Sequence, residues 1–438
     1  MGNNSTSQST IPDSLKISPY FKFLSKFFQD ISTVIKDGSR IVTISKFKEA
    51  FADDNVSIVE LLYKYFIVIA TDHVCHEMQK VSFISGFNKL LKLEYGSQDM
   101  AAFYIEVFSD GKVELTVKDI TAILCSVHSV QLKQERNHLP ESDTHFEVLA
   151  KSLFCKGADL VNRNECVNQV FQLWPRLFNH VHSWILRSLS KQEGSNDIVL
   201  HKHDCTRIQL QSSSDSHGIL DPIALWLLSV SIPALYLKSS RESEKKHEEY
   251  FTSELRKLYD SNEHGLSHNR FKHHCFSYRG PTLMAILLGN DVTLVLAIDV
   301  EWRESTKCFG DTATRLYQVS PQFKLLSEKN IVLFNERTRG LPVGLILGNN
   351  LSKPQVSLLD GLTSAKLGYL GGEETSVQKM QVWGCAGVKA ETAQKQQQNW
   401  EKRQAEQLQK VKLPGAWDEN PDKAILDMAG ITTEHARR

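Results

Sequence analysis

Three short groups of residues have side chains that could carry out chemistry. The groups His201-Lys202-His203-Asp204-Cys205 and His273-His274-Cys275 contain the imidazole and thiol groups that bind zinc. In the third group, His264 precedes Ser267 by three residues, which places a base near a hydroxyl. Neither zinc-like group has the spacing of a common zinc site or a fourth ligand, so we interpret both as surface loops. Gly265 favours a turn capped by Ser267 over catalysis.

The sequence also lacks the motifs of the common enzyme classes. It contains no nucleophile elbow, phosphate-binding loop, dinucleotide fingerprint or HExxH motif. We therefore expect a protein without enzymatic activity and without a cofactor or metal. A redox-active cysteine remains as an alternative, with Cys275 as its candidate because His274 is adjacent and a neighbouring histidine can activate a thiol.

Charge and cysteine usage limit the classes of protein to which this chain can belong. The chain has 438 residues with 51 basic and 51 acidic side chains, so no overall field attracts nucleic acid. Its eight cysteines are scattered without a CxxC pair, which predicts reduced thiols in an intracellular protein. We expect no secretory signal, and the apolar run Ile223–Leu237 contains Pro233 and is shorter than the roughly 20 residues that span a bilayer. This run is predicted to be a buried helix.

The first six residues, Met1-Gly2-Asn3-Asn4-Ser5-Thr6, fit the pattern for N-myristoylation of Gly2. A single myristoyl chain binds membranes only weakly, so a second contact is needed. The nearby Lys16, Lys22 and Lys26 form a thin basic cluster. We therefore expect the second contact to be a protein partner on the membrane.

The N-terminal half is predicted to be helical. Apolar residues recur at three- and four-residue spacing along its first helix, at Phe21, Leu24, Phe27, Phe28, Ile31, Val34 and Ile35. Short β-like stretches at 41–44, 81–83 and 111–115 each precede a further helix, and this order resembles EF-hand proteins. An unrelated helical bundle is the alternative.

Calcium ligands are missing from these loops. With Gly111 at position six of a calcium loop, Phe108 and Val117 fall at the third and twelfth positions, where oxygen ligands are required. We therefore expect an EF-hand-like scaffold without calcium binding, and the alternative of a calcium–myristoyl switch is disfavoured.

The C-terminal half is predicted to contain short strands. Apolar runs at 282–288 and 293–298 flank Gly289-Asn290-Asp291, which is a hairpin signature. Further strands are predicted at 315–319, 331–334, 355–359 and 380–383. A helix at 222–237 followed by many strands predicts an α+β fold with an antiparallel β-sandwich and flanking helices.

The segment Leu255–Ser267 is followed in order by Gly280-Pro281, Phe309-Gly310, Gly340-Leu341 and Val382-Trp383. These motifs, over about 235–385, resemble the TLDc domain, whose "LLYSS..HG.S" stretch is similar to Leu255–Ser267. The family's "GLGxGG" corresponds here to Gly340-Leu341-Pro342-Val343-Gly344, where one glycine is replaced by proline.

With Gly2 and the EF-hand-like region, the chain is similar to the N-myristoylated enhancer-of-Akt-null, mTOR-associated branch of this family. The resemblance implies a non-catalytic signalling adaptor that binds the peripheral head of the vacuolar proton pump (V-ATPase). It also implies partners in TOR and insulin-type (Akt–FoxO) signalling, and roles in growth, stress resistance and lifespan. The implied location is the cytoplasmic face of the plasma membrane or lysosome, with a cytosolic pool. An oxidation-resistance protein is the alternative.

The C-terminal extension is predicted to provide partner-binding residues. A polar, basic helix at 389–412 has one narrow apolar stripe and is either a binding helix, suited also to calmodulin, or a solvated spacer. A short helix begins at Asn420 with Pro421 at its first position. The candidate contact residues are Trp400, Lys402, Arg403, Leu408, Ile425, Leu426 and Met428.

The predicted organisation has five parts. They are a myristoylated N-terminus at 1–13, a helical EF-hand-like domain at 14–185, a connector at 186–218, a TLDc domain at 219–387 and a helical extension at 388–438.

Overall fold

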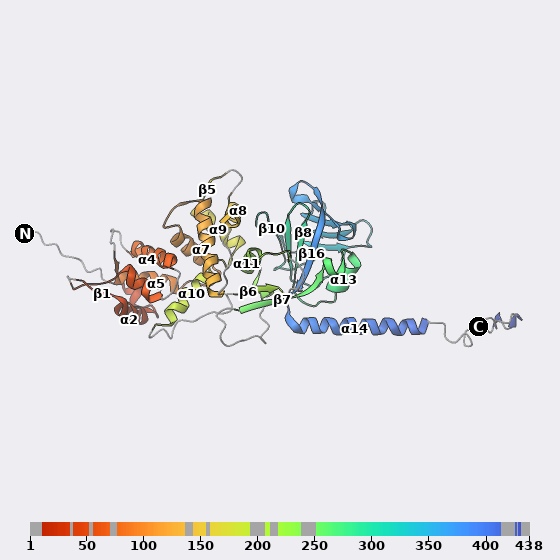
Figure 1. The fold of residues 1–438 in the computed structure, drawn as a ribbon, viewed down its shortest axis with the longest axis horizontal. Coiled ribbons are helices and arrows are strands. Elements are labelled where there is room, and N and C mark those ends of the chain that lie inside the picture. The colour runs from red at the N-terminus through yellow and green to blue at the C-terminus, as the bar shows by residue number, and fades with distance from the viewer. Residues whose placement is uncertain are drawn as a thin grey trace, which may run out of the picture.

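The computed structural model (Figure 1) describes residues 11–35, 38–51, 56–70, 77–135, 143–154, 158–192, 206–210, 218–237, 251–412, 425–426 and 428–430. A helical body is followed by a curled β-sheet, and a long helix extends from the sheet toward the C-terminus. Gly2 with its myristoylation pattern and His201–Cys205 lie outside the described residues. No helix in the described ranges is long and apolar enough to cross a membrane.

The helical body consists of helices joined by short strands. Its helices are α1 (Asp13–Lys16), α2 (Phe21–Ile31), α3 (Ile44–Phe51), α4 (Val56–Ala70), α5 (Lys80–Leu91), α6 (Gln98–Phe108), α7 (Val117–Glu135), α8 (Asp143–Lys151), α9 (Arg163–Leu173) and α10 (Asn179–Ser190). Its strands are β1 (Thr33–Val34), β2 (Arg40–Val42), β3 (Met78–Gln79), β4 (Glu114–Thr116) and β5 (Leu160–Asn162). The predicted first apolar face continues beyond α2, which ends at Ile31.

The short strands join the helices in pairs. Strand β2 pairs antiparallel with β3, and β4 pairs antiparallel with β5. Strands β2, β3, β4 and β5 lead into α3, α5, α7 and α9 respectively. The predicted stretch at 81–83 is wrong, because these residues lie inside α5 and the strand precedes them. The relation to EF-hand proteins stays a prediction.

Aromatic rings form the centre of the helical body. The rings of Phe83 and Phe87 lie 4.7 Å apart, and those of Phe66 and Phe87 lie 4.9 Å apart, measured between centroids. Such edge-on pairs add about 0.5–1.5 kcal/mol each beyond the burial of apolar area. The first helix contributes Phe27 and Phe28, which are buried as its apolar face predicts.

A short helix fastens the helical body to the sheet. Helix α11 (Pro222–Ser231) begins at the N-cap Asp221, whose carboxylate accepts a hydrogen bond from the backbone N–H of Ala224 (2.7 Å). The predicted continuous helix to Leu237 is interrupted after Ser231, because Pro233 cannot continue it, and a 3₁₀ turn, η2, spans Ala234–Leu237. The predicted burial of α11 is confirmed.

The helical body and the sheet share one apolar core. The rings of Trp174 and Phe323 lie 6.0 Å apart across the junction. The guanidinium of Arg176 donates to the carbonyl oxygens of Ser229 (2.6 Å) and Ile232. Strand β6 (Thr206–Leu210) pairs in parallel with β7 (Phe251–Asp260), which adds a backbone connection. The predicted connector at 186–218 therefore contains a strand of the sheet.

The main sheet contains eleven strands among the described residues. After β6 and β7 they are β8 (Thr282–Leu288), β9 (Thr293–Ile298), β10 (Arg315–Ser320), β11 (Lys324–Glu328), β12 (Val332–Asn335), β13 (Gly344–Leu347), β14 (Val356–Leu359), β15 (Ser364–Leu367) and β16 (Glu373–Gly384). The chain thus combines helices with an antiparallel sheet, as predicted. Strands β7, β11, β13 and β15 were not among the predicted strands.

The predicted sandwich is one curled sheet. Residues 373–376 of β16 pair with β15, whereas residues 377–384 pair with β8. Apolar residues from both halves, such as Leu294 and Leu358, meet in a second core between them. Helices α12 (Ser261–His264) and α13 (His268–Cys275) lie beside this sheet, and α14 (Gly387–Lys412) follows β16. His273, His274 and Cys275 therefore lie in a helix and not in the predicted loop.

Candidate functional site

Helix α14 begins against the sheet. It starts at Gly387, whose φ of +73° allows the chain to turn after β16. Ala390 packs against the core of the sheet, and Glu391 lies 3.9 Å from the guanidinium of Arg256 on β7. The predicted boundary at residue 388 therefore falls within the first turn of α14.

Two glutamines fasten α14 to the end of α13. The side-chain amide of Gln394 donates to the carbonyl oxygen of His274 (2.7 Å), and that of Gln398 donates to the carbonyl oxygen of His273 (3.0 Å). Both amides also contact the hydroxyl of Ser277, at 3.3 and 3.2 Å. The last carbonyls of a helix have no partner within it, so these amides cap α13. Gln394 is only 7% exposed.

Beyond Gln398 the helix leaves the sheet and projects away from it (Figure 1). Trp400 is 62% exposed, and Lys402 and Arg403 are exposed beside it. At about 100° per residue, Trp400 lies about 120° around the helix from Gln394, so fastening the glutamine face leaves the tryptophan accessible. A large exposed aromatic on a free helix is suited to bind a partner.

The other predicted contact residues differ in how exposed their side chains are. Ile425 and Met428 are exposed, at 64% and 87%, and Leu426 is half-buried. Leu408 belongs to α14, but its side chain lies outside the described part of the structure. Gln394 and Gln398 could not be predicted from the sequence, because a polar residue that binds a backbone carbonyl produces no apolar periodicity.

The residues with potential chemistry are arranged unfavourably for catalysis. Cys275 is fully buried, and this burial raises the pKa of its thiol well above the ordinary value, so the reactive thiolate is disfavoured. The backbone N–H of Asp260 donates to Nδ1 of His264 (3.2 Å), which occupies this nitrogen. The predicted turn at Gly265 is present, with φ of +76°, but Ser267 makes no side-chain capping bond.

Metal binding is equally unsupported within the described ranges, where no group of three or more histidine, cysteine, aspartate or glutamate side chains could hold an ion. The rings of His264 and His274 stack 3.8 Å apart. Burial, together with the nearby His264 and His273, lowers the pKa of His274 to about 4, so the stack is uncharged near neutral pH.

An exposed lysine in the loop between α6 and α7 pairs with a carboxylate. The ammonium of Lys112 lies 2.6 Å from a carboxylate oxygen of Asp119, and the other carboxylate oxygen accepts from the backbone N–H of Thr116 (2.9 Å). Burial would raise the pKa of Asp119, but the hydrogen bonds from Lys112 and Thr116 hold it below its ordinary value. Asp119, in the first turn of α7, thus already has a cationic partner.

We predict that the helical body binds no calcium in the micromolar range. Such affinity requires several oxygen ligands in one loop, and Asp119 is already paired with Lys112. Calorimetric titration of the full chain with calcium should give no heat beyond dilution. Lys112→Ala, which frees Asp119, should remain silent because a single carboxylate is insufficient. A tight site in either protein would contradict the prediction.

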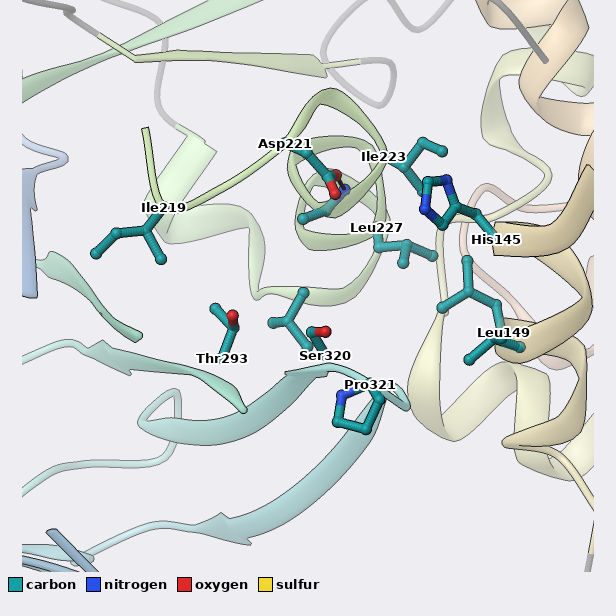
Figure 2. A pocket seen from close by; sticks show the side chains of 12 residues that line it. His145, Leu149, Ile219, Asp221, Ile223, Leu227, Thr293, Ser320 and Pro321 are labelled. Atoms are coloured by element: carbon teal, nitrogen blue, oxygen red, sulfur yellow. Dashed lines mark hydrogen bonds between the residues drawn. The ribbon is translucent and has the colours of Figure 1, made fainter. Parts of the chain in front are cut away.

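A cavity of about 320 Å³ lies between the helical body and the sheet (Figure 2). Helices α8 and α11 form one side, and the start of β9 with the end of β10 forms the other. Its lining is largely aliphatic, with polar groups from His145, Asp221, Thr293 and Ser320. This cavity leaves no local signal in the sequence, because its walls come from segments that are up to 176 residues apart, from His145 to Pro321.

Residues 235–385 match the family model of the TLDc domain, and the chain therefore contains this domain. The chain is also similar to fungal proteins named "Restriction of telomere capping protein 5". The protein of Leptosphaeria maculans is 25% identical over 252 residues, which cover 40% of this chain and 40% of that protein. The protein of Saccharomyces cerevisiae strain RM11-1a is 22% identical over 429 residues, which cover 75% of this chain and 72% of that protein.

A third relative, from Candida glabrata, is 25% identical over 252 residues, covering 42% of this chain and 45% of that protein. The predicted TLDc resemblance is thus confirmed. The narrower resemblance to the N-myristoylated, mTOR-associated branch is not what these relatives indicate.

Proposed function

We propose that this TLDc-domain protein is a non-enzymatic adaptor that binds a protein partner through α14. The observation that carries the proposal is the projection of α14 beyond Gln398, with Trp400 62% exposed. The glutamine cap on α13 supports it, because the cap fixes the start of the helix and leaves its outer part accessible. A helix that enters a partner's groove with an aromatic anchor is a common mode of recognition.

The family resemblance indicates which partner to test first. We propose the peripheral head of the vacuolar proton pump, with effects on TOR and Akt-pathway signalling as a consequence of that binding. The proposed location is the cytoplasmic face of the lysosome or plasma membrane. The paired strands of the helical body support an EF-hand-like scaffold as the second folded part.

We predict that Trp400→Ala weakens binding to the peripheral head about 30-fold, since truncating an aromatic anchor costs about 2 kcal/mol or more. The measurement is biolayer interferometry with the full chain and the purified head. Asn399→Ala is the matched control, because it changes the neighbouring exposed residue about 100° around the helix. Both variants should melt at the wild-type temperature.

The two variants separate the possible outcomes. Equal affinities for Trp400→Ala and wild type would assign any binding to another surface. No binding by the wild type would reject the pump as partner. In that case the adaptor proposal would require another partner whose binding also depends on Trp400.

A second prediction concerns the membrane. We predict that Gly2→Ala moves the protein from the membrane to the soluble fraction of cell extracts, because the variant cannot accept a myristoyl group. Mass spectrometry of the N-terminus should show the acyl chain on the wild type only. Asn3→Ala, which keeps Gly2, is the control and should stay on the membrane. An unmodified wild-type Gly2 would reject the proposed anchor.

A further inference from the structure

The cavity between the helical body and the sheet has the properties of a small-molecule site. Its volume of about 320 Å³ lies at the lower end of the roughly 300–1,000 Å³ range of ligand pockets. Such sites favour the junction of two folded parts, with aliphatic walls and a few polar groups. We propose that this cavity binds a small aliphatic amine, with its ammonium group at Asp221 and its carbon chain between α8, α11 and β10.

The first reason is a pair of hydroxyls on the cavity wall that make no hydrogen bond within the described part of the protein. Thr293, at the start of β9, is only 6% exposed and lines the cavity. Its hydroxyl makes no hydrogen bond to any described residue, and the same holds for the hydroxyl of Ser320. Neither oxygen is among the described side-chain atoms that are shielded from solvent without a partner, so both are open to the cavity. The Thr293 hydroxyl is therefore available to hydrogen-bond with a molecule in the cavity.

The second reason is the charge at the opposite side. Figure 2 shows the Asp221 carboxylate on one side of the opening and the hydroxyls of Thr293 and Ser320 across from it. One oxygen of Asp221 accepts the capping bond from Ala224. A carboxylate accepts up to about four hydrogen bonds, so Asp221 retains capacity for a donor. A carboxylate favours a positively charged donor over a neutral one.

The third reason is the shape of the remaining wall. Leu149, Ile223, Leu227 and Val319 present branched aliphatic side chains to the cavity. They suit a hydrocarbon chain and offer no partner for further polar groups. An ammonium group has three donors, which match a carboxylate and hydroxyl acceptors. Asp221 and His145, the two titratable residues on the lining, both lie at the exposed rim of the cavity. Together these features select a primary amine on a short aliphatic chain.

Binding at this place would join the two folded parts. Helices α8 and α11 contribute one wall and β9 and β10 the other, so the ligand would contact both at once. A molecule that binds only the native protein raises its melting temperature as its concentration rises above the dissociation constant.

The test uses three probes with the same carbon skeleton. These are 3-methylbutylamine, 3-methylbutanol and 3-methylbutanoate, titrated into the full chain labelled at isoleucine and leucine methyl groups. The amine should shift the signals of Ile223 and Leu227 at concentrations at least tenfold below those needed for the alcohol. The carboxylate should not bind, because Asp221 repels it. Equal affinities for all three probes, or shifts confined to other methyl groups, would overturn the proposal.

Two variants test the polar contacts. Asp221→Asn keeps an N-cap of equal quality but removes the charge, so amine affinity should fall at least tenfold while alcohol affinity is unchanged. Thr293→Val removes the hydroxyl and should weaken the amine several-fold without lowering the melting temperature of the empty protein. Wild-type amine affinity in Asp221→Asn would reject the assigned charge contact. If Thr293→Val binds the amine like wild type, the hydroxyl is not part of the site.

Discussion

Replacing Gly344 by alanine should prevent the chain from accumulating as folded protein. Gly344 begins β13 with φ of +111°, a conformation that residues with a side chain rarely adopt. An alanine Cβ at this position would lie 2.1 Å from the carbonyl oxygen of Leu358 on the paired strand β14. Because the obstacle is backbone, the strands must separate. Strain and overpacking together cost about 2–6 kcal/mol, a large part of a typical stability of about 5–15 kcal/mol.

Gly340 provides the matched control in the same loop. Its φ is +84°, but an added Cβ would meet nothing within 4 Å. Gly340→Ala should therefore lower the free energy of unfolding by only about 1–2 kcal/mol, the cost of the left-handed conformation alone. Urea unfolding of both variants and the yield of soluble protein measure the difference. Similar losses at the two positions would show that contact with Leu358 is unimportant.

This loop shows what sequence can and cannot predict. The family pattern identifies Gly340 to Gly344 as a glycine-containing loop, but it does not reveal that Leu358 makes Gly344 indispensable. Pro342 replaces a family glycine, and the contacts that hold the loop around this proline could not be predicted from the sequence. The buried amide of Asn335 donates to the carbonyl oxygens of Thr338 and Pro342, both at 3.1 Å, and so holds the loop from its base.

Strands with a strong local pattern were predicted well. The bounds of β8 and β9 agree with the predicted 282–288 and 293–298, because both runs are apolar and a turn signal separates them. Strand β15 (Ser364–Leu367) was missed since it has only four residues, of which Ser364 and Lys366 are polar. It forms because residues 373–376 of β16 and the neighbouring β14 supply its hydrogen bonds. Such pairing depends on distant segments and leaves little local signal.

The candidate site was also predicted only in part from the sequence. The polar helix with exposed Trp400 follows from the composition of 389–412, and the structure contains this helix. Its fastening through Gln394 to the carbonyl oxygen of His274 depends on where α13 ends, 120 residues earlier in the chain. The cavity at Asp221 could not be predicted from the sequence either, because its walls come from segments that lie far apart in the chain.

Acidification between about pH 6.5 and pH 4 should sharply destabilise the helical body. Burial lowers the pKa of His128 and of His182 to about 4. Burial, with Arg187 and Arg176 nearby, lowers the pKa of His180 to about 3. All three are at most 6% exposed, whereas an unfolded histidine titrates near 6.5. Below pH 6.5 these histidines become protonated in the unfolded chain but stay neutral in the folded chain. The free energy of unfolding therefore falls as the pH falls.

The size of the effect follows from the number of histidines. Each contributes about 1.4 kcal/mol per pH unit at its steepest, so the three together approach about 4 kcal/mol per unit near pH 5. The contribution of these three groups to stability should become nearly constant only above about pH 7.5, where the unfolded histidines are also neutral. The pKa values of Asp119 and Asp299 are held below 3.8, so the loss from these carboxylates comes at lower pH. Urea unfolding at intervals of half a pH unit measures how steeply the free energy of unfolding depends on pH.

His128 offers a variant that isolates one contribution. Its ring packs between Phe146 and Trp226, at centroid distances of 5.2 and 4.9 Å, where α7 meets α8 and α11. His128→Gln cannot take up a proton, so it should reduce the slope by about 1.4 kcal/mol per pH unit whatever it does to stability at pH 7.5. His145→Gln, at an exposed position, is the matched control for the substitution itself. An unchanged slope in His128→Gln would mean that this ring is protonated or solvated in the folded protein, and that the acid sensitivity arises elsewhere.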